Sequence, residues 1–263
     1  MKQRILTAVI AGAIFLPIVF YGNELLVIAT YIIATIGLHE LLKMRKLSLL
    51  TVPGVISALI LWIFLLPSEQ TVWFEDILFS KVELALLAVL LFLTYTVVTK
   101  NKFTFEDVAF AIMSTLYVGI GFYYLIETRE TGIIFILYSL FIIWATDSGA
   151  YFIGRAFGKR KLWPEISPNK TVEGFVGGII CAVVVAVLFS VFSDITDNVV
   201  FFLFVTIILS IFGQIGDLVE SAFKRYYNVK DSGNLLPGHG GILDRFDSLL
   251  FVLPLLNLLL LNA

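Results

Sequence analysis

Hydrophobic runs alternate with short polar segments along the whole chain. A helix of about 20 residues crosses the apolar core of a bilayer, and nine spans can be fitted to this pattern. The runs cover residues 5–20, 25–42, 52–66, 82–98, 108–126, 133–153, 175–192, 199–216 and 249–261. The first run resembles a signal peptide, but we read it as a retained helix. The pattern predicts an all-α polytopic integral membrane protein with about nine transmembrane helices.

Composition and charge support this class and orient the chain. The protein is 59% hydrophobic and 14% charged, whereas soluble domains are about half apolar and a quarter charged. All but two of its 18 Lys and Arg residues, Lys81 and Arg129, fall on one side when the helices alternate. The positive-inside rule then places the N-terminus in the cytoplasm and the C-terminus outside. We expect a multi-pass protein of the cell (inner) membrane. The one cysteine, Cys181, lies in an apolar run and is expected to be a small buried hydrophobe.

The polar residues divide the chain unequally. Residues 1–100 are expected to form a scaffold of N-terminal transmembrane helices. Residues 101–263 are expected to form a catalytic region with two polar loops, 154–174 and 217–247, at the cytoplasmic face. Charge this dense beside a membrane is costly unless it serves a function.

The first polar cluster runs from Asp147 to Lys159. Asp147 lies toward the cytoplasmic end of the sixth run, where it either lines a polar cavity or pairs with Arg155 at the interface. Gly154 and Gly158 are four residues apart, a spacing that also permits close helix packing.

The second cluster is Ser167-Pro168-Asn169-Lys170-Thr171-Val172-Glu173-Gly174, just before the seventh run. Free backbone N–H groups at a helix start attract phosphate, and Lys170 adds a positive charge. An ordinary helix cap by Thr171 or Ser167 explains the same residues equally well.

The third cluster extends from Asp217 to Asp247. If the eighth helix continues past Asp217, then Glu220, Ser221 and Lys224 share its face, because they lie three, four and seven residues on. Asp244 and Asp247 are three apart and share a face at the start of the last helix. Oxygen ligands from two helix ends suit Mg²⁺ when it also binds substrate phosphates.

The residues from Ser221 to Asp247 resemble the signature of the phosphatidate cytidylyltransferases, also called CDP-diacylglycerol synthases. The matching positions are Ser221, Lys224-Arg225, Lys230-Asp231, His239-Gly240-Gly241 and Asp244-Arg245-Phe246-Asp247. The two earlier clusters resemble family motifs in the same order, although the family more often has Lys at the position of Asn169.

The resemblance implies an enzyme that transfers a cytidylyl group from CTP to phosphatidic acid, forming CDP-diacylglycerol and pyrophosphate for phospholipid biosynthesis. It implies Mg²⁺ held by Asp217 and Asp244, and a second, monovalent cation is compatible with the number of acids. The expected catalytic residues are Asp217, Asp244, Asp247, Lys224 and Arg245. The expected substrate-binding residues are Lys170, Ser167, Thr171, Glu173, Ser221, Arg225, Lys230, His239, Gly240 and Asp147. The expected partners are the two substrates, the bilayer and a second copy in a homodimer, and no nucleic acid.

Two other functions fit parts of the pattern. A CTP-dependent lipid kinase, such as a dolichol kinase, would use a related nucleotide site but would release CDP. A transporter or ion channel would also carry acids within the membrane, but it should show polar residues near mid-membrane and paired broken helices. The charges here cluster at one face instead.

Overall fold

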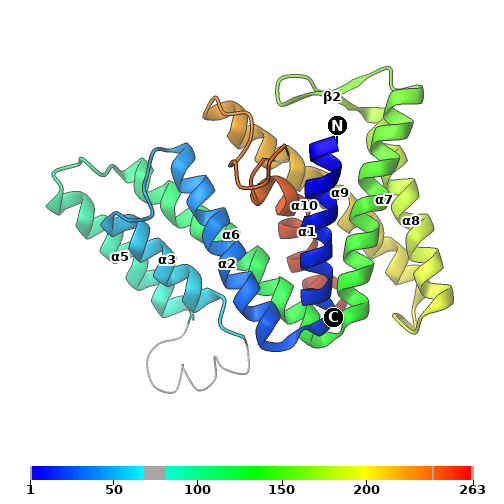
Figure 1. The fold of residues 1–263 in the computed structure, drawn as a ribbon, viewed down its shortest axis with the longest axis horizontal. Coiled ribbons are helices and arrows are strands. Elements are labelled where there is room, and N and C mark those ends of the chain that lie inside the picture. Colours follow the sequence, from blue (N-terminus) through cyan, green and yellow to red (C-terminus); the bar gives the residue numbers. More distant parts are fainter. Residues whose placement is uncertain (1, 68–80, 239, 262–263) are drawn as a thin grey trace. The chain divides into compact units, whose positions relative to one another are not determined.

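Nine α-helices and one β-hairpin form the part of the chain that our computed structural model describes, residues 2–67, 81–238 and 240–261 (Figure 1). The helices are α1 (Lys2–Tyr21), α2 (Asn23–Met44), α3 (Val52–Phe64), α5 (Lys81–Val98), α6 (Phe105–Thr131), α7 (Ile133–Phe157), α8 (Val172–Phe192), α9 (Val199–Tyr226) and α10 (Leu243–Leu256). The strands are β1 (Lys161–Trp163) and β2 (Ser167–Thr171), and a short π-helical segment (Asn257–Leu261) follows α10. Each of the nine predicted runs coincides with one of these helices, which confirms a nearly all-α fold.

Several helices have the length and composition of membrane spans. Within the described residues, α2, α6, α7, α8 and α9 are long and apolar enough to cross a bilayer. Shorter apolar helices cover Val9–Tyr21, Val52–Phe64 and Val82–Val98. The fold is thus that of a polytopic membrane protein, while the count of nine spans and the side of each terminus stay predictions.

The polar segments are more structured than the hydrophobic pattern indicates. The segment 154–174 holds the end of α7 and the whole β-hairpin. Helix α9 continues to Tyr226, although its apolar run ends near Gly216. Helix α10 begins at Leu243, six residues before the apolar run that predicted it. Each difference places polar, chemistry-bearing residues on regular structure.

The described chain divides into two compact units. The first unit comprises Met1–Glu127 and Asp231–Leu243, so that a short segment from late in the chain belongs to the N-terminal half. Its core contains fully buried side chains such as Leu38, Leu61, Phe92 and Phe122. At one end, Arg45 Nε donates to Asp107 Oδ1 at 2.6 Å and ties the end of α2 to the start of α6.

The second unit comprises Thr128–Lys230 and Asp244–Ala263. Its core joins α7, α8, α9 and α10 around Tyr138 and Phe202, which are fully buried. The Tyr138 hydroxyl is 2.7 Å from Thr206 Oγ1, and Thr146 Oγ1 is 3.0 Å from Ser210 Oγ. These buried polar pairs fix α7 against α9 and hold the candidate site between them.

Candidate functional site

Helices α7 and α8 pack closely because glycines face one another. They run side by side in Figure 1, with the hairpin beyond their ends. A Cβ atom on Gly174 would lie 2.6 Å from the Ala150 carbonyl oxygen and 3.0 Å from Gly154 Cα. A Cβ atom on Gly154 would lie 2.9 Å from Thr171 Oγ1. The close-packing interpretation of Gly154 is therefore confirmed.

A two-stranded antiparallel hairpin connects α7 to α8. Lys161 pairs with Thr171, and Trp163 pairs with Ser167. Arg225 Nε on α9 donates to the Ile166 carbonyl oxygen at 3.2 Å, which ties the hairpin to α9. The hairpin thus places the basic residues of the segment 159–171 beside the ends of three helices.

Two residues of the second cluster anchor the base of the hairpin. Thr171 is the N-cap of α8, and its Oγ1 accepts a hydrogen bond from the Gly174 N–H at 3.1 Å. The Glu173 carboxylate accepts bonds from the N–H groups of Lys159 at 3.0 Å and Arg160 at 3.2 Å. The helix-cap interpretation is confirmed for Thr171, and Glu173 holds the turn that enters β1.

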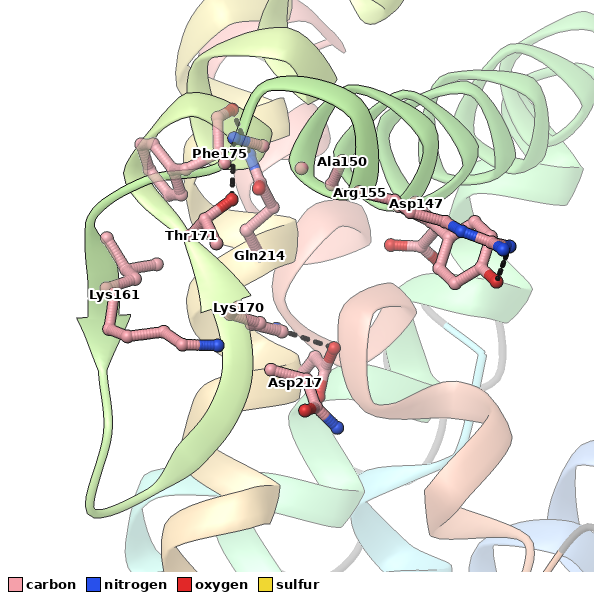
Figure 2. Close-up of a pocket in the computed structure, with 15 residues that line it drawn as sticks. Asp147, Ala150, Arg155, Lys161, Lys170, Thr171, Phe175, Gln214 and Asp217 are labelled. Atoms are coloured by element: carbon pink, nitrogen blue, oxygen red, sulfur yellow. Dashed lines mark hydrogen bonds and ion pairs between the residues drawn. The ribbon is translucent and has the colours of Figure 1, made fainter.

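A cavity of about 530 Å³ opens between α7, the hairpin, the start of α8 and α9 (Figure 2). Its charged and amide-bearing lining residues are Asp147, Arg155, Lys161, Asn169, Lys170, Gln214 and Asp217. Lys170 and Lys161 reach it from opposite strands of the hairpin, and Asp147 and Asp217 reach it from α7 and α9 (Figure 2). The volume falls within the range of small-molecule sites, and the lining suits an anionic ligand with a bound cation.

The centre of the cavity is an ion pair between the hairpin and α9. Lys170 Nζ lies 2.6 Å from Asp217 Oδ2. Asp147 lies within the electrostatic reach of both groups and of Arg245. In the described part of the chain, Asp147 forms no ion pair with Arg155, which instead donates to the Tyr151 hydroxyl at 3.3 Å. Asp147 thus faces the cavity, as one of its two sequence-based interpretations holds.

A second group of charges follows on the polar end of α9 and the first turns of α10. Lys224 Nζ is 3.3 Å from Glu220 Oε2 and 2.5 Å from Asp244 Oδ1. One turn earlier, Ser221 Oγ donates to Asp217 Oδ1 at 3.4 Å. The two helices approach closely here, because a Cβ atom on Gly216 would lie 2.6 Å from the Asp247 carbonyl oxygen. The predicted shared face of α9 is confirmed, and it meets the acidic start of α10.

These carboxylates fit a hard cation by their chemistry. Glu220 Oε1 is buried and has no hydrogen-bond partner among the described residues, while Asp217 and Asp244 each already bind an ammonium group. Across the same residues, no group of three or more His, Cys, Asp or Glu side chains is arranged to hold a metal ion by itself. Mg²⁺ is commonly bound by one or two carboxylates together with substrate phosphates. The donor set suits that mode of binding.

The structure brings together most, but not all, of the predicted site residues. Asp147, Lys170, Thr171 and Asp217 line the cavity. Ser221, Lys224, Asp244 and Asp247 belong to the adjoining α9–α10 group, and Arg245 lies within electrostatic reach of Asp147. The cavity lining does not include Ser167, Glu173, Arg225 or Lys230. Gly240 belongs to the first unit, and His239 lies outside the described residues.

Sequence reasoning did not assign several polar residues to the site that the structure places in or beside it, among them Lys161, Gln214 and Glu220. Lys161 was counted only as a cytoplasmic charge, but its place opposite Thr171 in the hairpin turns it toward the cavity. Gln214 lines the same cavity, and its Nε2 donates to the Phe175 carbonyl oxygen at 3.2 Å. Glu220 was noted for its spacing but not assigned a role. The sequence did carry a signal for Gln214 and Glu220, because each lies one helical turn from Asp217.

Comparison with known proteins covers nearly the whole chain. A model of the cytidylyltransferase family matches residues 2–262. The chain is 55% identical over 263 residues to the phosphatidate cytidylyltransferase of Bacillus subtilis (strain 168), covering 99% of this chain and 97% of that protein. It is 54% identical over 262 residues to the phosphatidate cytidylyltransferase of Staphylococcus haemolyticus (strain JCSC1435), covering all of both chains. The protein of the same name from Staphylococcus aureus (strain COL) is 53% identical over 264 residues.

Proposed function

Because this chain belongs to the cytidylyltransferase family and is therefore an enzyme of the nucleotidyltransferase class, we propose that it transfers a cytidylyl group from CTP to phosphatidic acid. The products are CDP-diacylglycerol, which serves phospholipid biosynthesis, and pyrophosphate, which is released. The sequence relatives that carry the name of this activity align over the full chain. The proposal thus concerns the whole protein rather than one segment.

The cavity between α7, the hairpin and α9 is the observation that carries the proposal. It presents Lys161, Lys170 and Arg155 to an anion while Asp147 and Asp217 provide oxygen ligands for a cation. A nucleoside triphosphate needs both, because its phosphates carry several negative charges close together. The Lys170–Asp217 pair, 2.6 Å long, is the point where the two kinds of contact meet.

The reaction asks the protein mainly for positioning and charge neutralisation. An oxygen of the lipid phosphate forms a bond to the α-phosphorus of CTP while the bond to the oxygen bridging to the β-phosphorus breaks. Pyrophosphate leaves with that electron pair. The lipid phosphate needs no general base, because the second pKa of a phosphate monoester is about 6. Lys170, Lys161, Arg245 and Lys224 neutralise charge on the reacting phosphates.

Mg²⁺ is the cofactor we assign to the carboxylates. Asp217 and Asp244 would hold it, with Asp247, Asp147 and Glu220 as neighbouring oxygen ligands or as groups that orient ligands. Bound there, it would neutralise charge on the transferred phosphate and the leaving group. A second, monovalent cation is compatible with the number of carboxylates.

The proposed enzyme lies in the cell membrane with its site at the cytoplasmic face. This orientation follows from the positive-inside distribution, in which the basic hairpin and the end of α9 share a side. CTP is a cytoplasmic nucleotide, and the lipid substrate reaches the site from the bilayer. A homodimer stays a prediction of the family resemblance.

The deciding experiment supplies purified protein in detergent with phosphatidic acid, Mg²⁺ and CTP labelled at the α-phosphate. We expect label in the lipid and release of pyrophosphate. Asp217→Asn should abolish nearly all turnover while the protein still inserts, because it removes a cation ligand and the partner of Lys170. The matched control is Asp194→Asn on an exposed turn, which should retain activity.

Two outcomes would count against the proposal. Unlabelled lipid with CTP intact would reject the substrate assignment. Transfer of the γ-phosphate to a lipid alcohol, with release of CDP, would identify a lipid kinase instead. Full activity of Asp217→Asn would leave the reaction standing but reject the metal assignment.

A further inference from the structure

Glu40 is a buried carboxyl group that the proposed reaction does not use. It lies near the end of α2, and only 4% of its surface is exposed. Its Oε1 accepts a hydrogen bond from the Ile242 N–H at 2.9 Å. Its Oε2 accepts bonds from the Leu243 N–H at 3.0 Å and from Ser232 Oγ at 3.1 Å. These donors come from one segment, residues 231–243, about 200 positions away in the chain.

That segment forms a loop whose two ends meet at Glu40. At its far end, the Leu236 N–H donates to the Gly240 carbonyl oxygen at 2.9 Å, and Gly240 has a φ of 84° that favours glycine. At its near end, a Cβ atom on either Gly233 or Gly241 would overlap the Glu40 carboxyl group. The second glycine of the His-Gly-Gly signature is therefore needed for close approach to Glu40.

Glu40 also supplies the cap that the sequence of α10 lacks. The first N–H groups of a helix have no partner within it, and a side chain just before the helix usually accepts from them. Here the preceding residue is Ile242, whose side chain cannot accept a hydrogen bond. Glu40 takes this place from α2, and a negative group at a helix start is also favoured by the helix dipole. Gly37, one turn earlier on α2, leaves room for Leu243, whose Cδ2 would lie 3.1 Å from a Cβ atom there.

We propose that Glu40 is a positioning residue, whose carboxyl group closes the neck of the loop 231–243 and fixes the first turn of α10. The residues that follow Leu243 in that turn are Asp244 and Arg245, assigned above to the cation and to phosphate. The inference rests on the proposed function and deepens it. Glu40 is assigned no role with substrate; it holds Leu243, to which Asp244 and Arg245 are joined in the same helical turn.

The direct test is hydrogen exchange of the Ile242 and Leu243 amides in Glu40→Gln, measured without substrates. The side-chain amide offers only one oxygen, and its NH₂ group would face a backbone N–H donor. We expect both amides to exchange about tenfold faster or more, as loss of a buried hydrogen bond gives. The matched control is Glu24→Gln, the same change at the exposed start of α2, which should leave exchange as in the wild type. Unchanged exchange in Glu40→Gln would overturn the proposal.

Kinetics then separate positioning from simple loss of stability. If Glu40 positions the signature, Glu40→Gln should raise the KM for CTP and the Mg²⁺ concentration for half-maximal rate about tenfold or more. The KM for phosphatidic acid should stay within twofold of the wild-type value. A lower melting temperature with both KM values unchanged would show a merely structural role and reject the proposal.

A second variant keeps the proposal testable if Glu40→Gln does not fold. Glu40→Asp keeps both acceptor oxygens but shortens their reach, so its KM for CTP should lie between those of the wild type and Glu40→Gln. A KM equal to the wild-type value in a folded Glu40→Asp, with unchanged exchange, would contradict the proposal. If the wild type itself transfers no cytidylyl group, the proposed function fails, while the exchange measurement still decides whether Glu40 holds the loop.

Discussion

At the scale of single residues, Lys224 joins two acidic groups, Glu220 and Asp244, that would otherwise repel one another. Its ammonium group contacts Glu220 and Asp244, whose side chains are 1% and 6% exposed, and its own side chain is 15% exposed. Burial of charges is costly, and such a group is stable only while its charges remain paired. The position of Lys224, seven residues after Asp217, lets one helix face carry the acids and the base.

Removing this ammonium group should therefore destabilise the protein. We expect Lys224→Met to lower the free energy of unfolding by about 3–5 kcal/mol, because two buried carboxyl groups lose their partner. Thermal unfolding in detergent measures the effect. Lys43→Met, on the exposed side of the last turn of α2, is the control and should change stability by less than about 0.5 kcal/mol. Equal melting temperatures for the two variants would show that the ion pairs of Lys224 do not stabilise the protein.

At the scale of elements, α7, the hairpin and α8 depend on a close approach of the two helix backbones and on a few side-chain hydrogen bonds. Gly154 and Gly174 let the two helices approach at the point where Thr171 caps α8. The hairpin is short, and its strands would be weak in isolation. Its position is fixed by Thr171 and Glu173 at its base and by Arg225 near its tip.

A methyl group at this crossing should disturb the cavity. Gly174→Ala places its Cβ atom against two backbone atoms, which cannot move as a side chain can. We expect a loss of about 1–3 kcal/mol in stability, together with reduced activity, since the cap and Lys170 shift with the start of α8. Melting temperature and label transfer are the two measurements. Gly12→Ala on α1, whose Cβ atom meets nothing within 4 Å, should be neutral in both.

The helices could be predicted from the sequence, but their polar extensions could not. Each apolar run was hydrophobic and long enough to indicate a helix, and each fell on one, although only five of the helices that the structure describes have the length and composition of a membrane span. The hydrophobic pattern does not indicate a helix beyond the last apolar residue. For this reason α9 was expected to end near Gly216 and α10 to begin near Leu249. The hairpin was not predicted, because Pro164, Pro168 and several Lys and Arg residues interrupt the alternation of apolar and polar residues that indicates a strand.

The candidate site divides in the same way. The contacts of Asp217 with Ser221 and of Glu220 with Lys224 follow from helical spacing alone and were expected. The Lys170–Asp217 pair joins residues almost 50 positions apart, and no local pattern predicts such a contact. Family resemblance named both residues but could not show that they touch.

At the scale of the whole molecule, the distribution of charge predicts which side of the membrane each loop faces. Sixteen of the 18 basic residues fall on the side assigned to the cytoplasm. The acidic turn between α8 and α9, which contains Asp197, falls on the other side. This assignment puts the hairpin and its cavity where CTP is present.

Cysteine labelling checks the assignment. In a Cys181→Ala background, Asp197→Cys should react with a membrane-impermeant maleimide in intact cells, and Lys102→Cys should react only after the membrane is opened. Both positions are exposed, so a lack of reaction reports sidedness rather than burial. The reverse pattern would place the cavity outside the cell and refute the cytoplasmic site.

The contact between Glu40 and the segment 231–243 also constrains how the protein is made. Glu40 emerges from the ribosome 192 residues before Ser232, the first of the donors named above. At about 5–20 residues per second, that separation corresponds to roughly 10–40 s of synthesis. Throughout this interval the carboxyl group lacks the donors on Ser232, Ile242 and Leu243 that it has in the folded protein. The first unit is the earliest to be synthesised, yet it can be completed only when nearly the whole chain has left the ribosome.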